Sequence, residues 1–115
     1  MHELSIVMSI VDTAETERQK QQANAVESIE LDIGELSGVE MDAFYFAWDA
    51  GTRHTALENA NLKINRPPAK AKCTACGKVF VAESSFDPCP DCGNPFCDII
   101  SGKELRIKRM TVIKN

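Results

Sequence analysis

Five cysteines fall within 25 residues of this 115-residue chain: Cys73, Cys76, Cys89, Cys92 and Cys97. The first four form two Cys-x-x-Cys pairs, and a glycine follows each pair. Two intervening residues let both thiolates of a pair turn toward one ion, and the glycine permits the tight backbone that this turn needs. Four thiolates in a tetrahedral array make a closed structural zinc site. The spacing therefore predicts zinc bound by Cys73, Cys76, Cys89 and Cys92.

Other chemistry for these cysteines is less favoured. Two redox dithiols would each be expected at the start of a helix, which neither pair is. Iron fits the same four thiolates, and spacing alone does not distinguish it from zinc. Cys97 is interpreted as a small, partly buried residue beside the site. Because a four-thiolate ion has no open position for water, the mechanism is expected elsewhere.

His2 is the second candidate, because of its position. A free α-amine, the backbone nitrogen of residue 2 and its imidazole can form fused chelate rings, a nitrogen-rich set that suits Ni(II) or Cu(II). Removal of Met1 is not expected before a residue as bulky as histidine, so the amine stays adjacent. By residue type alone, His2 would be a solvated helix start. His54, the other histidine, is interpreted as an exposed loop residue.

The elements that position these residues follow from hydrophobic periodicity. Apolar residues at steps of three and four from Leu4 to Ala14 predict an amphipathic helix that ends within residues 15–22. Alternation predicts strands at 26–33, 62–64 and 105–113, with the last register uncertain at Arg109. A capping-box pattern at 37–40 precedes a second helix that ends near Gly51.

The order is helix, strand, helix, strand, cysteine module and strand. Three strands need a common sheet, since a lone pair is only marginally stable. The fold class is therefore α+β, with the cysteine module inserted before the last strand. Pro67 and Pro68 mark the module's beginning.

Composition narrows the class of function. The net charge is −4 and the pI is near 5.1, so a nucleic-acid backbone is a poor partner for the chain as a whole. No apolar run approaches the roughly 20 residues of a membrane span, and no signal-peptide pattern opens the chain. A reducing cytoplasm is the expected location. No catalytic triad, phosphate-binding loop or open metal triad is present, so we predict that the protein is not an enzyme.

Several motifs together resemble one known family. They are Met1-His2-Glu3-Leu4-Ser5, Ile33-Gly34-Glu35-Leu36-Ser37-Gly38-Val39-Glu40, the two Cys-x-x-Cys-Gly knuckles and Ser101-Gly102-x-Glu104-Leu105. In this order, over nearly the whole chain, they are similar to the HypA/HybF hydrogenase nickel-incorporation proteins. The resemblance implies a metallochaperone that delivers Ni(II) to the large-subunit precursor of [NiFe]-hydrogenase. It also implies a HypB-type GTPase partner and, in some members, service to urease.

The same resemblance implies an architecture and a nickel site. Residues 1–66 and 105–115 would form a nickel-binding α+β domain, with two helices and a three-stranded antiparallel sheet. Residues 67–104 would form a rubredoxin-like zinc ribbon. By position, His2 becomes the nickel ligand, with the Met1 amine and the backbone nitrogens of His2 and Glu3. Glu3 and Glu40 are candidate side-chain neighbours, and Cys97 matches no family ligand.

Two rival functions remain open from the residues. A zinc-ribbon module that binds nucleic acid or a protein is the first, and the basic residues Lys103, Arg106, Lys108 and Arg109 favour it weakly. A small iron or redox protein of rubredoxin type is the second. The chain also lacks the histidines that some relatives place beside their zinc cysteines, so a link between zinc and nickel through such residues is not expected.

Overall fold

The computed structural model describes residues 2–114, and the chain divides into two compact units. The first unit contains the chain up to Leu31, residues 39–64 and the chain from Ile107 on. The second contains residues 32–38 and 65–106. The chain passes between the units at 31/32, 38/39, 64/65 and 106/107, so each unit is assembled from segments that are distant in sequence.

Helix α1 (Glu3–Lys20) buries Val7, Val11 and Ala14, which follow one another at steps of four and three. This confirms the helix that periodicity predicts, including its end within the polar run. Leu4 and Met8, expected on the same apolar face, are instead 54% and 40% exposed. They lie at the edge of the stripe, which in this helix is narrow.

Helix α2 (Met41–Gly51) buries Phe44, Ala47 and Trp48. The rings of Phe44 and Trp48 stack with their centroids 6.0 Å apart. The helix starts later than the capping-box pattern suggests, because Glu40 itself is the N-cap and its carboxylate accepts from the backbone N–H groups of Asp42 and Ala43. At the other end, a Cβ on Gly51 would lie 2.8 Å from Val7 Cγ1, so glycine lets the two helices approach closely.

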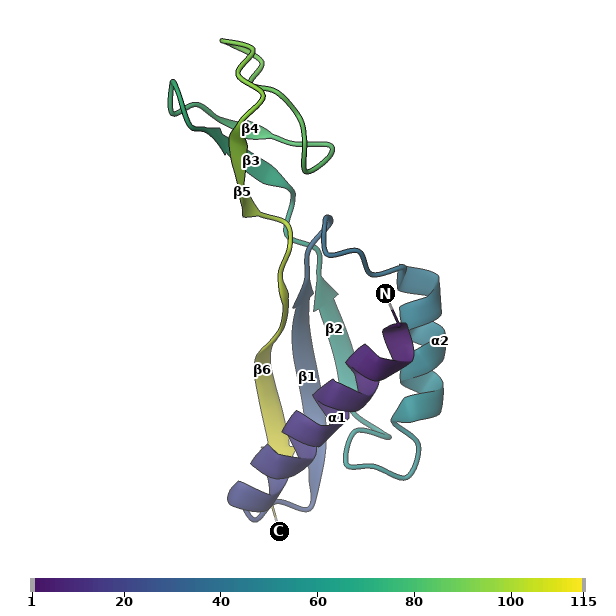
Figure 1. Cartoon of the computed structure of the whole chain (residues 1–115). Helices are drawn as coiled ribbons and strands as arrows, with labels where there is room; N and C mark the ends of the chain where they lie inside the picture. The colour runs from purple at the N-terminus through teal and green to yellow at the C-terminus, as the bar shows by residue number, and fades with distance from the viewer. Residues whose placement is uncertain (1, 115) are drawn as a thin grey trace. The chain divides into compact units, whose positions relative to one another are not determined.

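The sheet beside these helices has the strand order β2-β1-β6 (Figure 1). Its strands are β1 (Ala25–Ile33), β2 (Asn61–Asn65) and β6 (Leu105–Ile113). In β1, Ile29, Leu31 and Ile33 are buried, as their alternation with polar residues predicts. Leu57, in the connection before β2, is also buried.

Contacts between side chains define the strand directions. Glu30 pairs with Lys108 and Asp32 with Arg106, so partner numbers run in opposite senses and β6 is antiparallel to β1. Glu30 also pairs with Lys63, and Asp32 accepts from Asn65. Residue numbers on β1 and β2 therefore rise in the same sense, so these two strands are parallel. The arrowheads of β1 and β2 point the same way in Figure 1, because α2 returns the chain to the end of the sheet where β1 begins. The predicted α+β class is confirmed. In this sheet β6 is antiparallel to β1, whereas β2 runs parallel to β1.

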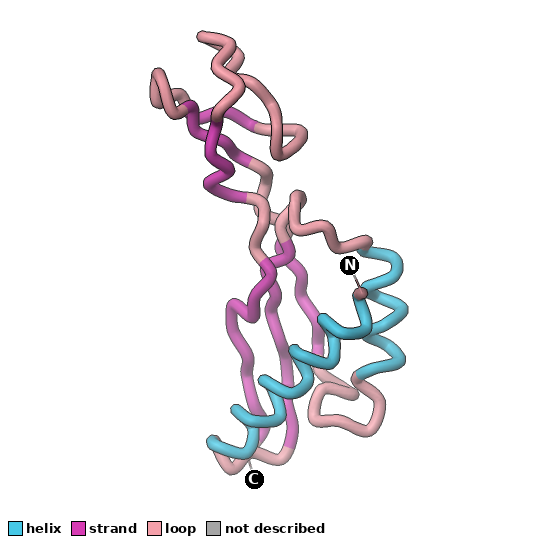
Figure 2. Tube along the Cα trace, viewed as in Figure 1, coloured by secondary structure: helices cyan, strands magenta, loops and turns pink. Residues whose placement is uncertain are grey.

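The second unit contains a smaller sheet with the order β4-β3-β5, drawn as short magenta strands between longer loops in Figure 2. Its strands are β3 (Lys70–Cys73), β4 (Val79–Val81) and β5 (Cys97–Ser101), and both pairings are antiparallel. Its core is built on Ala69, Ala71 and Ala82. Leu36, Phe80, Cys97 and Ile99 pack against these alanines. Three strands within the loop-rich cysteine module are consistent with the expected zinc ribbon.

Backbone contacts close the second unit around its shorter segment. The N–H of Gly34 donates to the carbonyl of Glu104 at 2.8 Å, and the N–H of Leu36 donates to Gly102 at 2.6 Å. A Cβ on Gly34 would collide with the Gly102 carbonyl, so this approach requires glycine. Two of the motifs that carry the family resemblance therefore contact each other. Between residues 2 and 114, neither helix is long and apolar enough to cross a membrane.

Candidate metal centres

The four cysteines of the paired motifs lie together at one end of the small sheet. Cys73 ends β3, and Cys76 follows it in a turn; Cys89 and Cys92 occupy an equivalent turn before β5. One sulfur from each residue lies within 4.8 Å of the other three. Among the described residues, this is the one group of three or more His, Cys, Asp or Glu side chains with such a spacing.

The two knuckles repeat one hydrogen-bonding pattern. In the first, the N–H of Gly77 donates to the carbonyl of Cys73 at 3.1 Å; in the second, Gly93 donates to Cys89 at 2.9 Å. Gly77 and Gly93 have φ values of 77° and 73°, in the left-handed region that favours glycine. The glycine after each pair is therefore required by the turn, as the sequence predicts.

The distances between the sulfur atoms fit a metal ion with tetrahedral coordination. Cys73 Sγ lies 3.5 Å from Cys92 Sγ, and Cys76 Sγ lies 3.6 Å from Cys89 Sγ. A tetrahedron with metal–sulfur distances of about 2.3 Å places its sulfurs about 3.8 Å apart. Each short pair joins one cysteine from each knuckle, so a bound ion would link the two turns. Cys73 and Cys89 are buried, whereas Cys76 and Cys92 are exposed.

The surroundings of the four thiols lower the pKa of some and raise the pKa of others. Hydrogen bonds from the backbone N–H of Cys76 and the side chain of Asn94 lower the pKa of Cys73 to about 5. The backbone N–H of Asn94 lowers the pKa of Cys92, but the adjacent sulfurs of Cys73, Cys89 and Cys76 outweigh it and raise that pKa to about 12. Four thiolates this close repel one another, and a divalent cation offsets that repulsion.

Asn94 is a functional residue that sequence reasoning missed. Its Nδ2 lies 3.5 Å from Cys73 Sγ, 2.9 Å from Thr74 Oγ1 and 3.1 Å from the carbonyl oxygen of Phe96. These bonds connect the second knuckle to the sulfur and the turn of the first. A polar residue directly after a Cys-x-x-Cys-Gly motif is the available signal, because groups that donate to ligand sulfurs tune a metal site.

Cys97 lies beside the site but outside the cluster. It is opposite Cys73 in the β3–β5 register, and its Sγ lies 3.5 Å from the carbonyl oxygen of Asn94. Burial, and then the nearby Cys73 thiolate, raise the pKa of the Cys97 thiol. A neutral, half-buried thiol agrees with the interpretation of Cys97 as a packing residue.

His2 is the N-cap residue of α1, and its side chain makes no capping hydrogen bond. The residue is exposed and has an extended backbone, with φ −85° and ψ 101°. The first N–H groups of a helix have no acceptor within it, so the backbone nitrogens at this end are also uncommitted to the helix. Met1, the remaining predicted contributor to the nickel site, lies outside the described residues.

Glu3 and Glu40, the predicted neighbours of His2, lie close to each other. The backbone N–H of Glu40 donates to Glu3 Oε2 at 3.2 Å, and this bond is the main cause that lowers the pKa of Glu3. The Glu40 carboxylate caps α2 instead of facing a metal. In this structure the Glu3 carboxylate joins the two helices, and the Glu40 carboxylate serves α2 alone.

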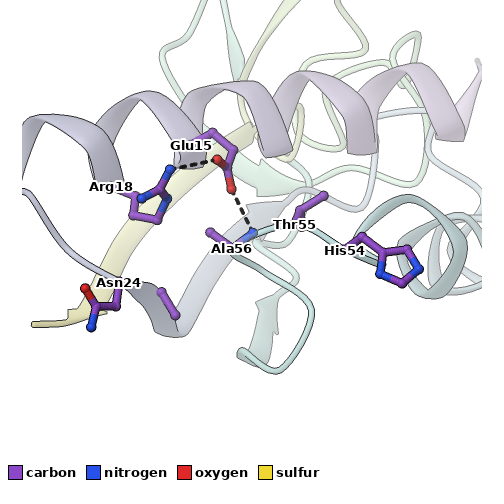
Figure 3. Close-up of a pocket in the computed structure, with 7 residues that line it drawn as sticks. Glu15, Arg18, Asn24, His54, Thr55 and Ala56 are labelled. Carbon is purple, nitrogen blue, oxygen red and sulfur yellow. Dashed lines mark hydrogen bonds and ion pairs between the residues drawn. The ribbon is translucent and has the colours of Figure 1, made fainter.

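His54 lies outside both centres. It has φ 63°, and its backbone N–H donates to Glu58 Oε2 at 2.8 Å. Its side chain is 94% exposed, as expected. It borders a hollow of about 480 Å³ in which Glu15 pairs with Arg18 and accepts from the N–H of Ala56 (Figure 3).

The basic run of β6 is paired with carboxylates of β1. Arg106 Nε lies 2.9 Å from Asp32 Oδ2, which belongs to a residue that is 4% exposed. Lys108 and Arg109 both reach Glu30, at 3.8 and 3.2 Å. These pairings reduce the positive charge available to a nucleic-acid backbone.

Comparison with protein families identifies the chain's relatives. The family model described as hydrogenase/urease nickel incorporation, metallochaperone, hypA matches residues 1–112. A hydrogenase maturation factor HypA from Geobacter metallireducens is 45% identical over 112 residues, which cover 97% of this chain and 99% of that protein. One from Alkalilimnicola ehrlichii is 41% identical over the same shares of the two chains.

Solved structures agree with the sequence comparisons. The solution structure of the nickel metallochaperone HypA from Helicobacter pylori superposes with a TM-score of 0.72, at 26% identity, with all of both chains covered. A second HypA solution structure gives a TM-score of 0.75, also at 26% identity. These findings confirm the family that the motifs suggested. The chain belongs to the HypA family of hydrogenase/urease nickel-incorporation metallochaperones, whose members carry metal and are not enzymes.

Proposed function

We propose that this chain binds Ni(II) at its N-terminus and delivers it to the large-subunit precursor of [NiFe]-hydrogenase. The ligands would be the His2 imidazole, the backbone nitrogens of His2 and Glu3, and the Met1 amine. The observation that carries this proposal is the state of His2, which is exposed at the start of α1 and makes no capping hydrogen bond. A helix start normally uses its N-cap side chain, so this imidazole is free for another partner.

Glu3 and Glu40 hold the terminal site in place under this proposal. Their hydrogen bond ties the first residue of α1 to the cap of α2. The site thus stands on two packed helices, although its ligands lie at a chain end. Sites supported by rigid elements hold their ligands more accurately than sites on free loops.

Zinc is the proposed resident metal, held by Cys73, Cys76, Cys89 and Cys92. A closed set of four thiolates stabilises a fold and leaves no position for substrate. We assign zinc to the module of residues 67–104 and nickel to the part formed by residues 1–66 and 105–115. The two metals would therefore have separate tasks, one structural and one transferred.

Transfer would proceed by ligand exchange. An exposed terminal chelate lets the ligands of an acceptor replace its own one at a time. The affinity for Ni(II) should be on the order of micromolar, or about −8 kcal/mol, because a much tighter site would slow release. A HypB-type GTPase would act with the chain, and maturation proteins of urease are further candidate partners.

A titration of two forms of the protein tests the nickel site. The first form keeps its native N-terminus without a tag, and the second carries a few residues before Met1. Zinc is quantified in both, and Ni(II) binding is followed by calorimetry. We expect one zinc per chain in both forms and one nickel only in the native form. Nickel bound equally by both forms would contradict the terminal site, and nickel bound by neither would contradict the chaperone proposal for this chain.

A further inference from the structure

The fifth cysteine lies on the same face of the small sheet as the metal cluster. Cys97 begins β5 and is directly opposite Cys73, which ends β3. Directly opposite residues of an antiparallel pair project from one face of the sheet, with their Cβ atoms about 5 Å apart. The sulfur of Cys73 belongs to the cluster, so the side chain of Cys97 starts next to a ligand and on the ligand's side of the sheet.

The Cys97 thiol is also held against the second knuckle. Its Sγ lies 3.5 Å from the carbonyl oxygen of Asn94. The backbone N–H of Cys89 donates to that same oxygen at 2.9 Å, so the thiol shares an acceptor with the backbone of a second ligand. Cys97 is therefore placed beside both Cys73 and Cys89, the two buried members of the cluster.

Packing alone does not require sulfur at this position. Cys97 and Ile99 pack against the alanine core of the module, a contact that an alanine or valine side chain could also make. The thiol reaches a carbonyl that already accepts from Cys89, so it does not satisfy an otherwise unpaired acceptor. The property that distinguishes cysteine here is its ability to bind zinc as a thiolate.

The four cluster cysteines differ in how easily they can be lost as ligands. Cys73 and Cys89 are buried, whereas Cys76 and Cys92 are exposed. Among thiolates, those that solvent can reach are the ones most open to electrophiles and oxidants. Loss of Cys76 or Cys92 would leave three thiolates, with the Cys97 thiol beside two of them.

We propose that Cys97 is a reserve zinc ligand, which completes the set of four when Cys76 or Cys92 is lost. Its thiol would release a proton to solvent, and its sulfur would bond to the ion in place of the lost sulfur. Zinc has no geometric preference that arises from d electrons, so it can accept a set of four thiolates that includes Cys97. The inference rests on the proposed zinc site and adds a fifth residue to it.

Paired serine variants test the inference. Zinc affinity is measured by competition with a chromophoric chelator, and Co(II) in place of zinc reports the number of thiolate ligands through its charge-transfer absorption. Cys76→Ser and Cys92→Ser should each keep a four-thiolate Co(II) spectrum. Addition of Cys97→Ser to either variant should leave three thiolates and lower the zinc affinity by at least about 100-fold, because even loss of a supporting residue costs about 10- to 100-fold. Cys97→Ser alone should bind zinc like the unmodified chain.

The possible outcomes separate this inference from the zinc site on which it rests. A three-thiolate spectrum in both single variants would overturn the reserve role. So would equal zinc affinity with and without Cys97 in those two backgrounds. Absence of zinc and of a four-thiolate spectrum in the unmodified chain would instead contradict the zinc site itself.

Brief alkylation of the zinc-loaded, unmodified chain tests the same role without substitutions. Native mass spectrometry should find zinc retained in chains that are alkylated once, at Cys76 or Cys92. In those chains Cys97 should be protected from a second alkylating reagent, because its sulfur is then bound to the ion. Loss of zinc on the first alkylation, or a Cys97 that reacts as fast as in the zinc-free chain, would overturn the inference.

Discussion

The backbone N–H of Glu40 donates to the side chain of Glu3, so the cap of the second helix is hydrogen-bonded to the first residue of the first helix. The two residues are 37 positions apart in the chain. Their bond orders the region immediately after His2, and it uses a carboxylate that could otherwise have bound metal. Its behaviour can be followed directly in solution.

Acidification should break this bond at a pH below the usual range for glutamate. The Glu40 N–H lowers the pKa of Glu3 in the folded chain, so the stabilisation is present above the unfolded-state pKa and is lost as the pH falls through the lowered value. We expect the Glu40 amide resonance to follow that transition in ¹⁵N spectra recorded against pH. In Glu3→Gln this titration should disappear. A transition at or above the usual glutamate pKa would contradict the bond.

Replacement of His2 should abolish nickel binding and leave zinc binding unchanged. His2→Ala removes the proposed imidazole ligand, but its side chain makes no cap bond, so the fold and the zinc content should not change. Calorimetry with Ni(II), together with zinc analysis, measures both effects. His54→Ala is the matched control, because His54 is the other histidine and is highly exposed. Loss of nickel in the control, or its retention in His2→Ala, would show that the site is misassigned.

Loss of the Asn94 amide should weaken the zinc site. Asn94→Ala removes a donor to Cys73 Sγ, and loss of such a partner typically reduces metal affinity by about 10- to 100-fold. The pKa of Cys73, held at about 5 partly by Asn94, should rise, so protons compete with zinc at higher pH. Zinc release measured against pH should therefore shift upward in the variant.

Cys97→Ser is the comparison for this experiment. Cys97 lies beside the same turn but is not among the four clustered sulfurs. Its substitution should leave the pH of zinc release close to that of the unmodified chain. Equal release curves for Asn94→Ala and the unmodified chain would remove Asn94 from the zinc site.

A methyl group at Gly51 should destabilise the first unit. The added Cβ would lie 2.8 Å from Val7 Cγ1, and overpacking of this kind costs about 1–3 kcal/mol. Chemical denaturation of Gly51→Ala measures the loss. Combined with Val7→Ala, which removes the colliding methyl group, the substitution should cost less than in the unmodified background. An additive result in this double-mutant cycle would show that the helices do not meet through this pair.

The sequence predicts the four-cysteine cluster more fully than it predicts the residues around that cluster. The four cysteines were predictable because each knuckle is local, and two residues between ligands leave few arrangements of the backbone. Asn94 was not predictable as a donor to Cys73, since it reaches a sulfur 21 residues away. Leu57 was missed because a single buried leucine in a polar connection has no periodicity.

Helix starts and strand directions were likewise predictable only in part. The hydroxyl of Ser37 matched a capping box, yet the longer Glu40 side chain reaches the N–H groups of Asp42 and Ala43 and caps α2. The alternation of apolar residues predicted the position of β2 but not its direction. That direction depends on the end of the sheet to which α2 returns the chain. The proposed N-terminal nickel ligands, by contrast, depend on position in the chain more than on folding.

The strand order β2-β1-β6 has a consequence for synthesis of the protein. β6 is the last of the described strands to be synthesised, and until it is present, one edge of β1 lacks its partner. An unpaired strand edge is a template for association with other chains. All residues of the second unit precede Ile107, so its chain is complete before the last segment of the first unit is added.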